Sequence, residues 1–283
     1  MDFLNLKKLD NNTYEGTELW SPFPGYPIFG GQLAAQSLCA GLFTVNFQSS
    51  PNFVHSIFLN PGDPSCPVEY TVQNIKDGKT LQMRNILGKQ NGKFLVQTTI
   101  CCTLGDSKDR DYKNIQIIEK DVFVPINDYI LHNLSKSNYD TELINKQYNL
   151  LVENLGVLNH SFEIKIGRFR NNKRQIKINI LKNNISKRDF YLFMTLVSDL
   201  LIVESALLSL NMNIFSKELH KISSVDHNLY FVTSKVPKDK TIYYILECIN
   251  IHESKANIEG KMCTEDGTLI CITSQQALVR FKK

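Results

Sequence analysis

The fold is decided by one stretch of the 283-residue chain, FYLFMTLVSDLLIVESALLSL, which runs from Phe190 to Leu210. It is apolar nearly all round a helical period, and a helix over residues 189–210 would span about 33 Å. A helix of this kind must be enclosed by other elements. Asp199 and Glu204 near its middle would each cost about 2.5 to 3.5 kcal/mol at a bilayer centre. The sequence therefore predicts a buried core helix and no membrane span.

Segments with the pattern of strands surround this helix, and their order occurs twice. In the first half they are interrupted by a small, apolar segment with helical spacing, Leu33–Ala40, which follows Gly30 and Gly31. In the second half the long helix starts near Ser186, a plausible N-cap. The expected strands are 4–9, 13–17, 54–59, 67–75, 80–88 and 94–104, then 162–166, 175–180, 224–232, 241–251, 256–263 and 268–279. The expected turns are Asp77-Gly78, Asn91-Gly92, Asn171-Asn172 and Asp266-Gly267.

Strands, a helix and four more strands occurring twice indicate a duplicated α+β unit. One antiparallel sheet wrapped around one long helix is the hot-dog arrangement. We therefore expect a double hot-dog with two long helices, each wrapped by an antiparallel sheet. The expected domains are an N-terminal hot-dog over 1–105, a linker with a helix over 106–159 and a C-terminal hot-dog over 160–283.

Composition argues against several classes of protein. The net charge is only +4 and the basic residues are spread along the chain, which is a weak basis for nucleic-acid binding. The seven cysteines form no Cys-x-x-Cys pair, so neither a zinc site nor a disulfide framework is expected, and the compartment should be reducing. No signal peptide or transit peptide is expected at residues 1–8. We expect no metal and no cofactor.

Asp199 is the outlier of the long helix. An ionised carboxylate among apolar residues costs several kcal/mol unless it is hydrogen-bonded. Glu204 would lie about 140° around the helix from it, which argues against a catalytic pair. Spacing alone leaves two interpretations open: a functional carboxylate, or a residue that caps a backbone amide or faces a solvated edge.

Two histidines align in the repeat, His55 and His227, and this predicts a shared structural role. Asp226 beside His227 suggests a dyad, but adjacent strand residues point to opposite faces. Ser224, Asp226 and His227 are therefore not expected to form a nucleophilic triad.

Six segments together resemble the acyl-CoA thioesterase II family, and they occur in the family's order over nearly the whole chain outside the linker. They are Phe29–Leu38 (FGGQLAAQSL), Val54–Asp63 (VHSIFLNPGD), Lys76–Thr80 (KDGKT), Val197–Asp199 (VSD), Ser224–His227 (SVDH) and Gln275–Arg280 (QQALVR). The chain is most like the bacterial and peroxisomal members, which are double hot-dog enzymes that cleave acyl-CoA to fatty acid and CoA.

The resemblance implies a catalytic set of Asp199, Ser224 and Gln275. Asp199 would take a proton from water, while Ser224 and Gln275 would orient that water for direct attack on the thioester. It also implies an acyl-CoA substrate, a homo-oligomer, and the cytosol or peroxisomal matrix as the compartment. The chain departs from the family at Tyr230–Val232, where the family has Trp-Phe-His, and at Glu253–Ile258, where a Gly-rich, Arg-containing stretch is replaced. It ends in Arg280-Phe281-Lys282-Lys283 and not in the peroxisomal Ser-Lys-Leu.

Two other functions remain open from the sequence. A hot-dog enoyl-thioester hydratase would need a His working with a carboxylate near the helix, and the long helix contains no His. A catalytically silent acyl-CoA-binding paralogue is the second alternative. The backbone at Gly30 and Gly31 could donate to a thioester carbonyl, or the glycines could serve close packing alone.

Overall fold

The computed structural model describes residues 2–22, 25–104, 116, 118–136, 141–159, 161–182, 184–233, 236–238 and 240–282. Its helices are the short 3-10 turn Asp2–Leu4 and α1 Gly30–Leu42, α2 Ile126–Ser135, α3 Thr141–Asn159, α4 Lys187–Ser198 and α5 Glu204–Ser209. Its strands are β1 Lys7–Lys8, β2 Thr13–Gly16, β3 Ser49–Phe58, β4 Val68–Asp77, β5 Leu81–Gln90, β6 Lys93–Leu104, β7 Val124–Pro125, β8 Phe162–Ile166, β9 Lys173–Ile180, β10 Leu219–Ser224, β11 Asp226–Phe231, β12 Thr241–His252, β13 Lys255–Thr264 and β14 Leu269–Phe281.

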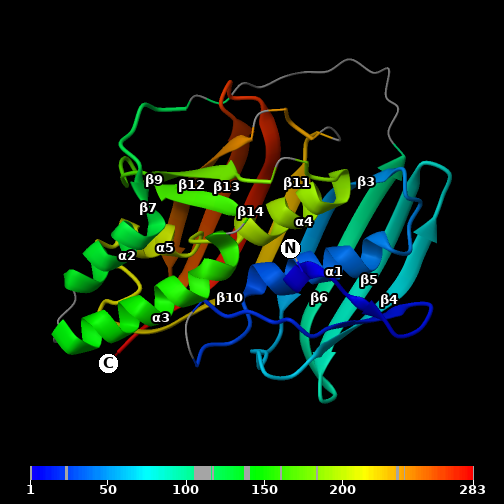
Figure 1. Ribbon diagram of the computed structural model, residues 1–283, viewed down its shortest axis with the longest axis horizontal. Coiled ribbons are helices and arrows are strands. Elements are labelled where there is room, and N and C mark those ends of the chain that lie inside the picture. The colour runs from blue at the N-terminus through cyan, green and yellow to red at the C-terminus, as the bar shows by residue number, and fades with distance from the viewer. Residues whose placement is uncertain are drawn as a thin grey trace.

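The strands form one antiparallel sheet in which the two halves have the same strand order. From one edge the order is β1-β2-β4-β5-β6-β3, and it continues as β11-β14-β13-β12-β9-β8-β7, with β10 paired to β14. The halves are joined where β3 pairs with β11, with Val54 opposite Leu229. Figure 1 shows the broad curved sheet of both halves behind α1 and α4.

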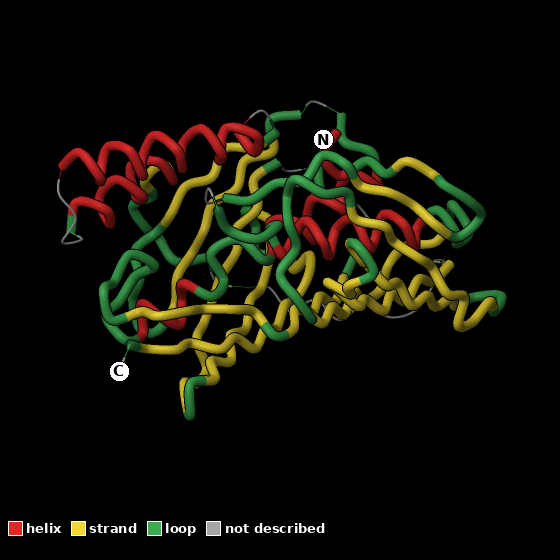
Figure 2. The backbone as a smooth tube through the Cα atoms, turned by 90° about the horizontal axis from the view of Figure 1, so that it is seen from below, coloured by secondary structure: helices red, strands yellow, loops and turns green. Residues whose placement is uncertain are grey.

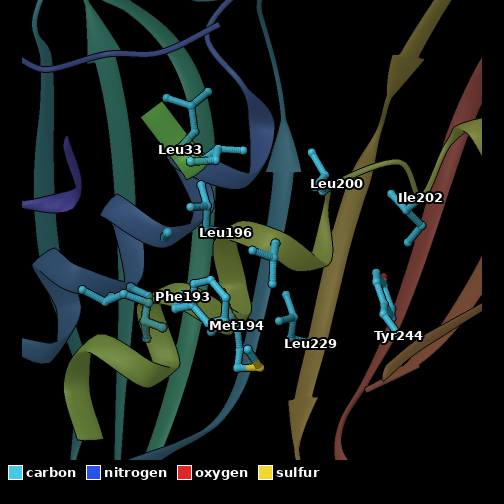
Figure 3. Packing of buried hydrophobic residues seen from close by; sticks show 14 of the residues in the cluster. Leu33, Phe193, Met194, Leu196, Leu200, Ile202, Leu229 and Tyr244 are labelled. Atoms are coloured by element: carbon cyan, nitrogen blue, oxygen red, sulfur yellow. The ribbon is translucent and has the colours of Figure 1, made fainter. Parts of the chain in front are cut away.

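The helices α1 and α4 lie against each other on one face of the sheet and run in opposite directions. Arg188 at the start of α4 donates to the sulfur of Cys39 near the end of α1 at 2.9 Å. Apolar side chains fill the space between the helices and the sheet, among them Leu33 on α1, Leu196 on α4 and Leu229 on β11 (Figure 3). The tube view shows strands both above and below the central helices, because the sheet curves around them (Figure 2).

The single long helix expected over 189–210 is wrong. It begins as predicted, with Ser186 Oγ accepting from Asp189 N at 3.0 Å, but α4 ends at Ser198 and α5 begins only at Glu204. Between them Leu201 adopts a left-handed conformation with φ of 59°, which costs energy for a residue with a β-carbon. The two long helices of the expected fold are thus replaced by shorter ones, and none of the described helices is long and apolar enough to cross a membrane.

Most of the other expected strands were confirmed to within a few residues. The strand expected over 4–9 is wrong, because Leu4 ends a 3-10 turn and only Lys7–Lys8 form a strand. The strand expected over 224–232 is β11, Asp226–Phe231, whereas Ser224 ends a separate strand, β10, and Val225 lies between the two. The segment expected to hold one helix, 106–159, holds α2 and α3 in its described part, while 105–115 lies outside the described residues. The Asn91-Gly92 and Asn171-Asn172 turns have positive φ at both residues, as such tight turns require.

The shared role expected for His55 and His227 is also wrong. His227 is fully buried on the helix-facing side of β11. His55 instead stacks on Phe53 and meets the ring edge of Tyr230, and Tyr230 is 46% exposed on the outer face. A one-residue offset in a strand moves a side chain to the other face of the sheet. Aligning His55 with His227 therefore places the two halves of the sequence one residue out of register.

Candidate active site

Asp199 is the first residue after α4 and lies at the interface between the two helices. Its side chain is buried, at 8% exposure. A β-carbon built on Gly30 would lie 2.7 Å from Asp199 Oδ2, and one built on Gly31 would lie 3.1 Å from Asp199 Cβ. The end of α4 and the start of α1 can approach this closely only because both positions are glycine.

The backbone N–H of Gly31 donates to the Asp199 carboxylate. The first N–H groups of a helix have no partner within the helix, and Phe29 at the N-cap of α1 offers no side-chain acceptor. Asp199 therefore caps α1 from the end of a different helix. The positive end of the α1 dipole also favours the negative charge there. The close packing expected at Gly30 and Gly31 is thus confirmed, and the amide of Gly31 is directed at Asp199.

Ser224 and Gln275 are brought together by the register of the sheet. Ser224 is the last residue of β10 and pairs with Ala277, two positions beyond Gln275 on β14. Gln275 points to the helix-facing side, at 3% exposure, and its Nε2 donates to Ser224 Oγ at 2.8 Å. The Gln275 side chain also donates a hydrogen bond to Asp199. All three residues singled out from the sequence therefore form one cluster.

Burial raises the pKa of Asp199 from its ordinary 3.8 to about 7, and the hydrogen bonds from Gln275 and Gly31 only partly oppose this rise. Asp199 Oδ1 and Gln275 Oε1 are both buried and have no hydrogen-bond partner among the described residues. A carboxylate with a pKa near neutrality, flanked by unpaired polar atoms, is suited to accept a proton from a bound reactant.

Three residues that the sequence did not assign to the site, Ser198, His227 and Tyr244, also belong to it. Ser198 Oγ lies 2.7 Å from His227 Nε2, and Tyr244 donates to the Ser198 carbonyl at 2.7 Å. Gln275 lies within hydrogen-bonding range of His227 and acts to raise its pKa, but burial dominates and lowers that pKa to about 4. The long apolar segment Phe190–Leu210 holds no His, whereas His227 reaches the end of α4 from a strand.

The remaining acidic candidates are engaged elsewhere. Asp226 accepts from the backbone of Gln276 at 2.7 Å and from Asn228 at 2.9 Å, so the expectation that it forms no triad with His227 holds. Glu204 pairs with Arg174 at 2.7 Å, and both side chains are 2% exposed. No cluster of three or more metal-ligating side chains occurs within the described part of the chain.

Two family models match this chain. The acyl-CoA thioesterase N-terminal domain matches residues 17–105, and the acyl-CoA thioesterase C-terminal domain matches residues 187–279. The second match contains Asp199, Ser224 and Gln275. The chain belongs to the acyl-CoA thioesterase II family. It is thereby a thioester hydrolase.

Two proteins that resemble this thioesterase match nearly the whole of its chain. Human acyl-coenzyme A thioesterase 8 is 23% identical over 99% of this chain and 88% of its own. The tesB protein of Mycobacterium avium subsp. paratuberculosis has a similar structure, with a TM-score of 0.75, 19% identity and coverage of 98% of this chain and 97% of its own.

A conserved protein with a hot-dog fold from Alicyclobacillus acidocaldarius superimposes with a TM-score of 0.72 at 12% identity. The match covers all of this chain and 98% of that protein. The fold of this thioesterase is therefore of the hot-dog type, as expected from its duplicated strand order.

Proposed function

We propose that this thioesterase hydrolyses fatty acyl-CoA to a free fatty acid and CoA by direct attack of water. Asp199 accepts a proton from the water as its oxygen bonds to the thioester carbonyl carbon. The C–S bond then breaks, and the proton passes to the CoA sulfur. No covalent acyl-enzyme forms, and no metal or cofactor takes part.

The observation that carries this proposal is the cluster in which Gln275 donates to both Ser224 and Asp199. With a pKa near 7, Asp199 is largely ionised just above neutral pH and is a useful base there. Ser224 and the Gln275 amide hold the water in line, and the amide can also bind the developing negative charge on the carbonyl oxygen.

Replacing the base tests the proposal. Asp199→Asn should fold and bind a non-hydrolysable acyl-CoA analogue, while its kcat falls about 100-fold or more. Asp189→Asn, at the opposite end of α4, is the matched control and should keep normal turnover. Thiol release from saturated acyl-CoA of several chain lengths is the measurement. Near-normal hydrolysis by folded Asp199→Asn would remove Asp199 as the base.

The position of His227 gives a reason to test enoyl-thioester hydration as a second function. His227 is connected to the Asp199 cluster through Gln275 and Ser198, and a hydratase needs a His and a carboxylate in one site. Incubation with 2-enoyl-CoA separates the reactions, because hydration consumes the double bond without releasing thiol. A silent acyl-CoA-binding protein would do neither.

We also propose that the chain is a double hot-dog, with an N-terminal domain over 1–105, a linker over 106–159 and a C-terminal domain over 160–283. The two domains together form one active site per chain. The N-terminal half supplies Gly30 and Gly31, and the polar residues of its helix are engaged in structure. Gln32 binds Trp20 N and Phe3 O, and Gln36 binds Phe3 O and Tyr70. Titration with a tight acyl-CoA analogue should reach saturation at one molecule per chain.

We propose, in addition, that the protein forms a homo-oligomer. We place it in a reducing intracellular compartment, either the cytosol or the peroxisomal matrix. Apolar side chains are exposed on adjacent strands of the outer face, including Ile57, Tyr230 and Ile272, and such patches often mark contacts between subunits. Seven free cysteines, six of them buried, fit a reducing environment. Light scattering of the purified protein and fractionation of cells test these two points.

A further inference from the structure

His227 lies between the last turn of α4 and the Gln275 amide, buried from solvent on every side. Its Nε2 contacts Ser198 Oγ at 2.7 Å. Its Nδ1 is buried without a partner of full hydrogen-bond geometry among the described residues, and so is Gln275 Oε1. Gln275 nevertheless lies within hydrogen-bonding range of the imidazole. The ring therefore connects the end of the helix to the amide that contacts Asp199.

The hydrogen bonds of this cluster fix which imidazole nitrogen carries the proton. With burial lowering its pKa to about 4, His227 is neutral and has one donor and one acceptor nitrogen. Ser198 Oγ can donate either to Thr195 O, at 2.9 Å, or to His227 Nε2. In the first case Nε2 carries the proton, and Nδ1 and Gln275 Oε1 face each other as two buried acceptors. In the second case Nδ1–H donates to Oε1, and both atoms are satisfied.

Rotating the Gln275 amide by 180° does not rescue the first arrangement. The rotated amide would satisfy Nδ1, but it would turn Oε1 toward Asp199 and remove the donor that lowers the pKa of that carboxyl. The present orientation places Nε2 on Ser224 at 2.8 Å. Only His227 protonated on Nδ1 can donate to Gln275 Oε1 and so hold the amide in this orientation.

We propose that His227 is a positioning residue for thioester hydrolysis, which holds the Gln275 amide with its NH2 group toward Asp199 and Ser224 by donating from Nδ1 to Oε1. Ser198 selects the tautomer by donating to Nε2, and Tyr244 holds Ser198 in place through the Ser198 carbonyl. The imidazole transfers no proton and touches no reacting atom. The inference rests on the proposed function, because it concerns the residue that orients the attacking water.

The charges around the cluster are few. Asp199 follows the last residue of α4, and Asp226 lies beside His227 on β11. Tyr244 faces the cluster from β12, and burial raises its pKa well above the usual 10. The start of α1 contributes only glycines. Burial raises the pKa of Asp199 and the Gln275 donor lowers it, so losing that donor leaves burial less opposed and raises the pKa of Asp199 further.

Two substitutions of His227 by amide residues distinguish a role in orienting Gln275 from a role in packing alone. Asn at position 227 places an N–H close to the position of Nδ1, whereas Gln places its amide close to the position of Nε2. His227→Asn should keep kcat within about threefold, and His227→Gln should lower kcat about 10- to 100-fold with little change in KM. The acid limb of the pH profile of kcat/KM should move to higher pH in His227→Gln alone. His220→Gln, exposed on β10, is the control and should behave as the parent protein.

Equal losses in folded His227→Asn and His227→Gln, or an unchanged kcat and pH profile in His227→Gln, would overturn the positioning role. Nitrogen NMR of the imidazole in the unaltered protein provides a readout that does not depend on a variant folding. It should show a neutral ring with the proton on Nδ1, and a proton on Nε2 would also overturn the inference. These outcomes are distinct from failure of the proposed function, which would appear as full activity in Asp199→Asn.

Discussion

Asp199, just after the last residue of α4, accepts a hydrogen bond from the backbone N–H of Gly31 in the first turn of α1. One carboxylate thus serves as the cap of a helix from the other half of the chain and as the candidate base. The hydrogen bond and the helix dipole both favour the ionised form, while burial disfavours it more strongly. The balance of these effects gives the Asp199 carboxyl a pKa of about 7.

The pH dependence of hydrolysis should follow the ionisation of Asp199. The base acts only when deprotonated, so kcat/KM should rise as pH increases through about 7 and level off above it. His227 is neutral throughout this range because its pKa lies near 4. Initial rates between pH 5 and 9 check this, and a kcat/KM that is already level at pH 5.5 would contradict the raised pKa.

Asp199→Asn should be more stable than the parent protein above neutral pH. The pKa of Asp199 is raised on folding, so between about pH 4 and 7 the folded state holds a proton that the unfolded state has lost. Stability of the parent protein therefore falls as pH rises through this window, and the variant escapes a cost of up to about 4 kcal/mol at pH 8. Chemical unfolding of both proteins at pH 5 and pH 8 should show the variant's advantage growing with pH.

Gly31→Ala should harm both stability and turnover. Its β-carbon would clash with the Leu196 carbonyl oxygen and would push α1 away from α4. We expect a loss of about 1–3 kcal/mol of stability and at least about a 10-fold loss of kcat. Gly156→Ala on α3 is the matched control, because its β-carbon meets no atom within 4 Å, and it should gain up to about 1 kcal/mol. If Gly31→Ala behaved like the control, the close approach of the helices would be wrong.

Glu204→Gln should destabilise the protein by about 3–5 kcal/mol, because it leaves the Arg174 charge buried without a counter-charge. The double variant Arg174→Met/Glu204→Leu should recover much of this loss. Thermal unfolding of the parent, single and double variants measures the effect. A Glu204→Gln protein as stable as the parent would mean that the pair is solvated.

Extensive chelation should leave hydrolysis unchanged. The proposed water is activated by side chains alone, and the described residues hold no cluster of three metal-ligating groups. The measurement is the rate of thiol release after dialysis against a strong chelator. Loss of activity that zinc or manganese restores would require a different mechanism.

The sequence predicted most of the strands for physical reasons, and the three residues that it singled out lie together in the structure, while their catalytic role is a proposal. Alternation along strands such as Phe162–Ile166 marks one buried face, and Asp199 stood out because a carboxylate in an apolar run needs an explanation. The contact between Ser224 and Gln275 followed only from the family resemblance, because their separation of 51 residues carries no local signal.

The helix break and the role of His227 could not be predicted from the sequence. No proline or glycine interrupts the apolar run after Ser198, so local propensity favoured one continuous helix. The break arises from tertiary contacts at the end of α4, where Asp199 meets Gly31 and Tyr244 binds the Ser198 carbonyl. His227 was misplaced because an alignment off by one residue reverses the face of a strand.

The pairing of β3 with β11 has a consequence for how such a protein could have arisen. Each half covers the backbone edge of the other, so either half produced alone would expose a row of unsatisfied N–H and C=O groups and be prone to aggregate. An ancestral single unit could avoid this by pairing with a second copy of itself. Fusion of two such copies would make that contact permanent, and the N-terminal copy, whose α1 holds no acidic residue, would still shield Asp199.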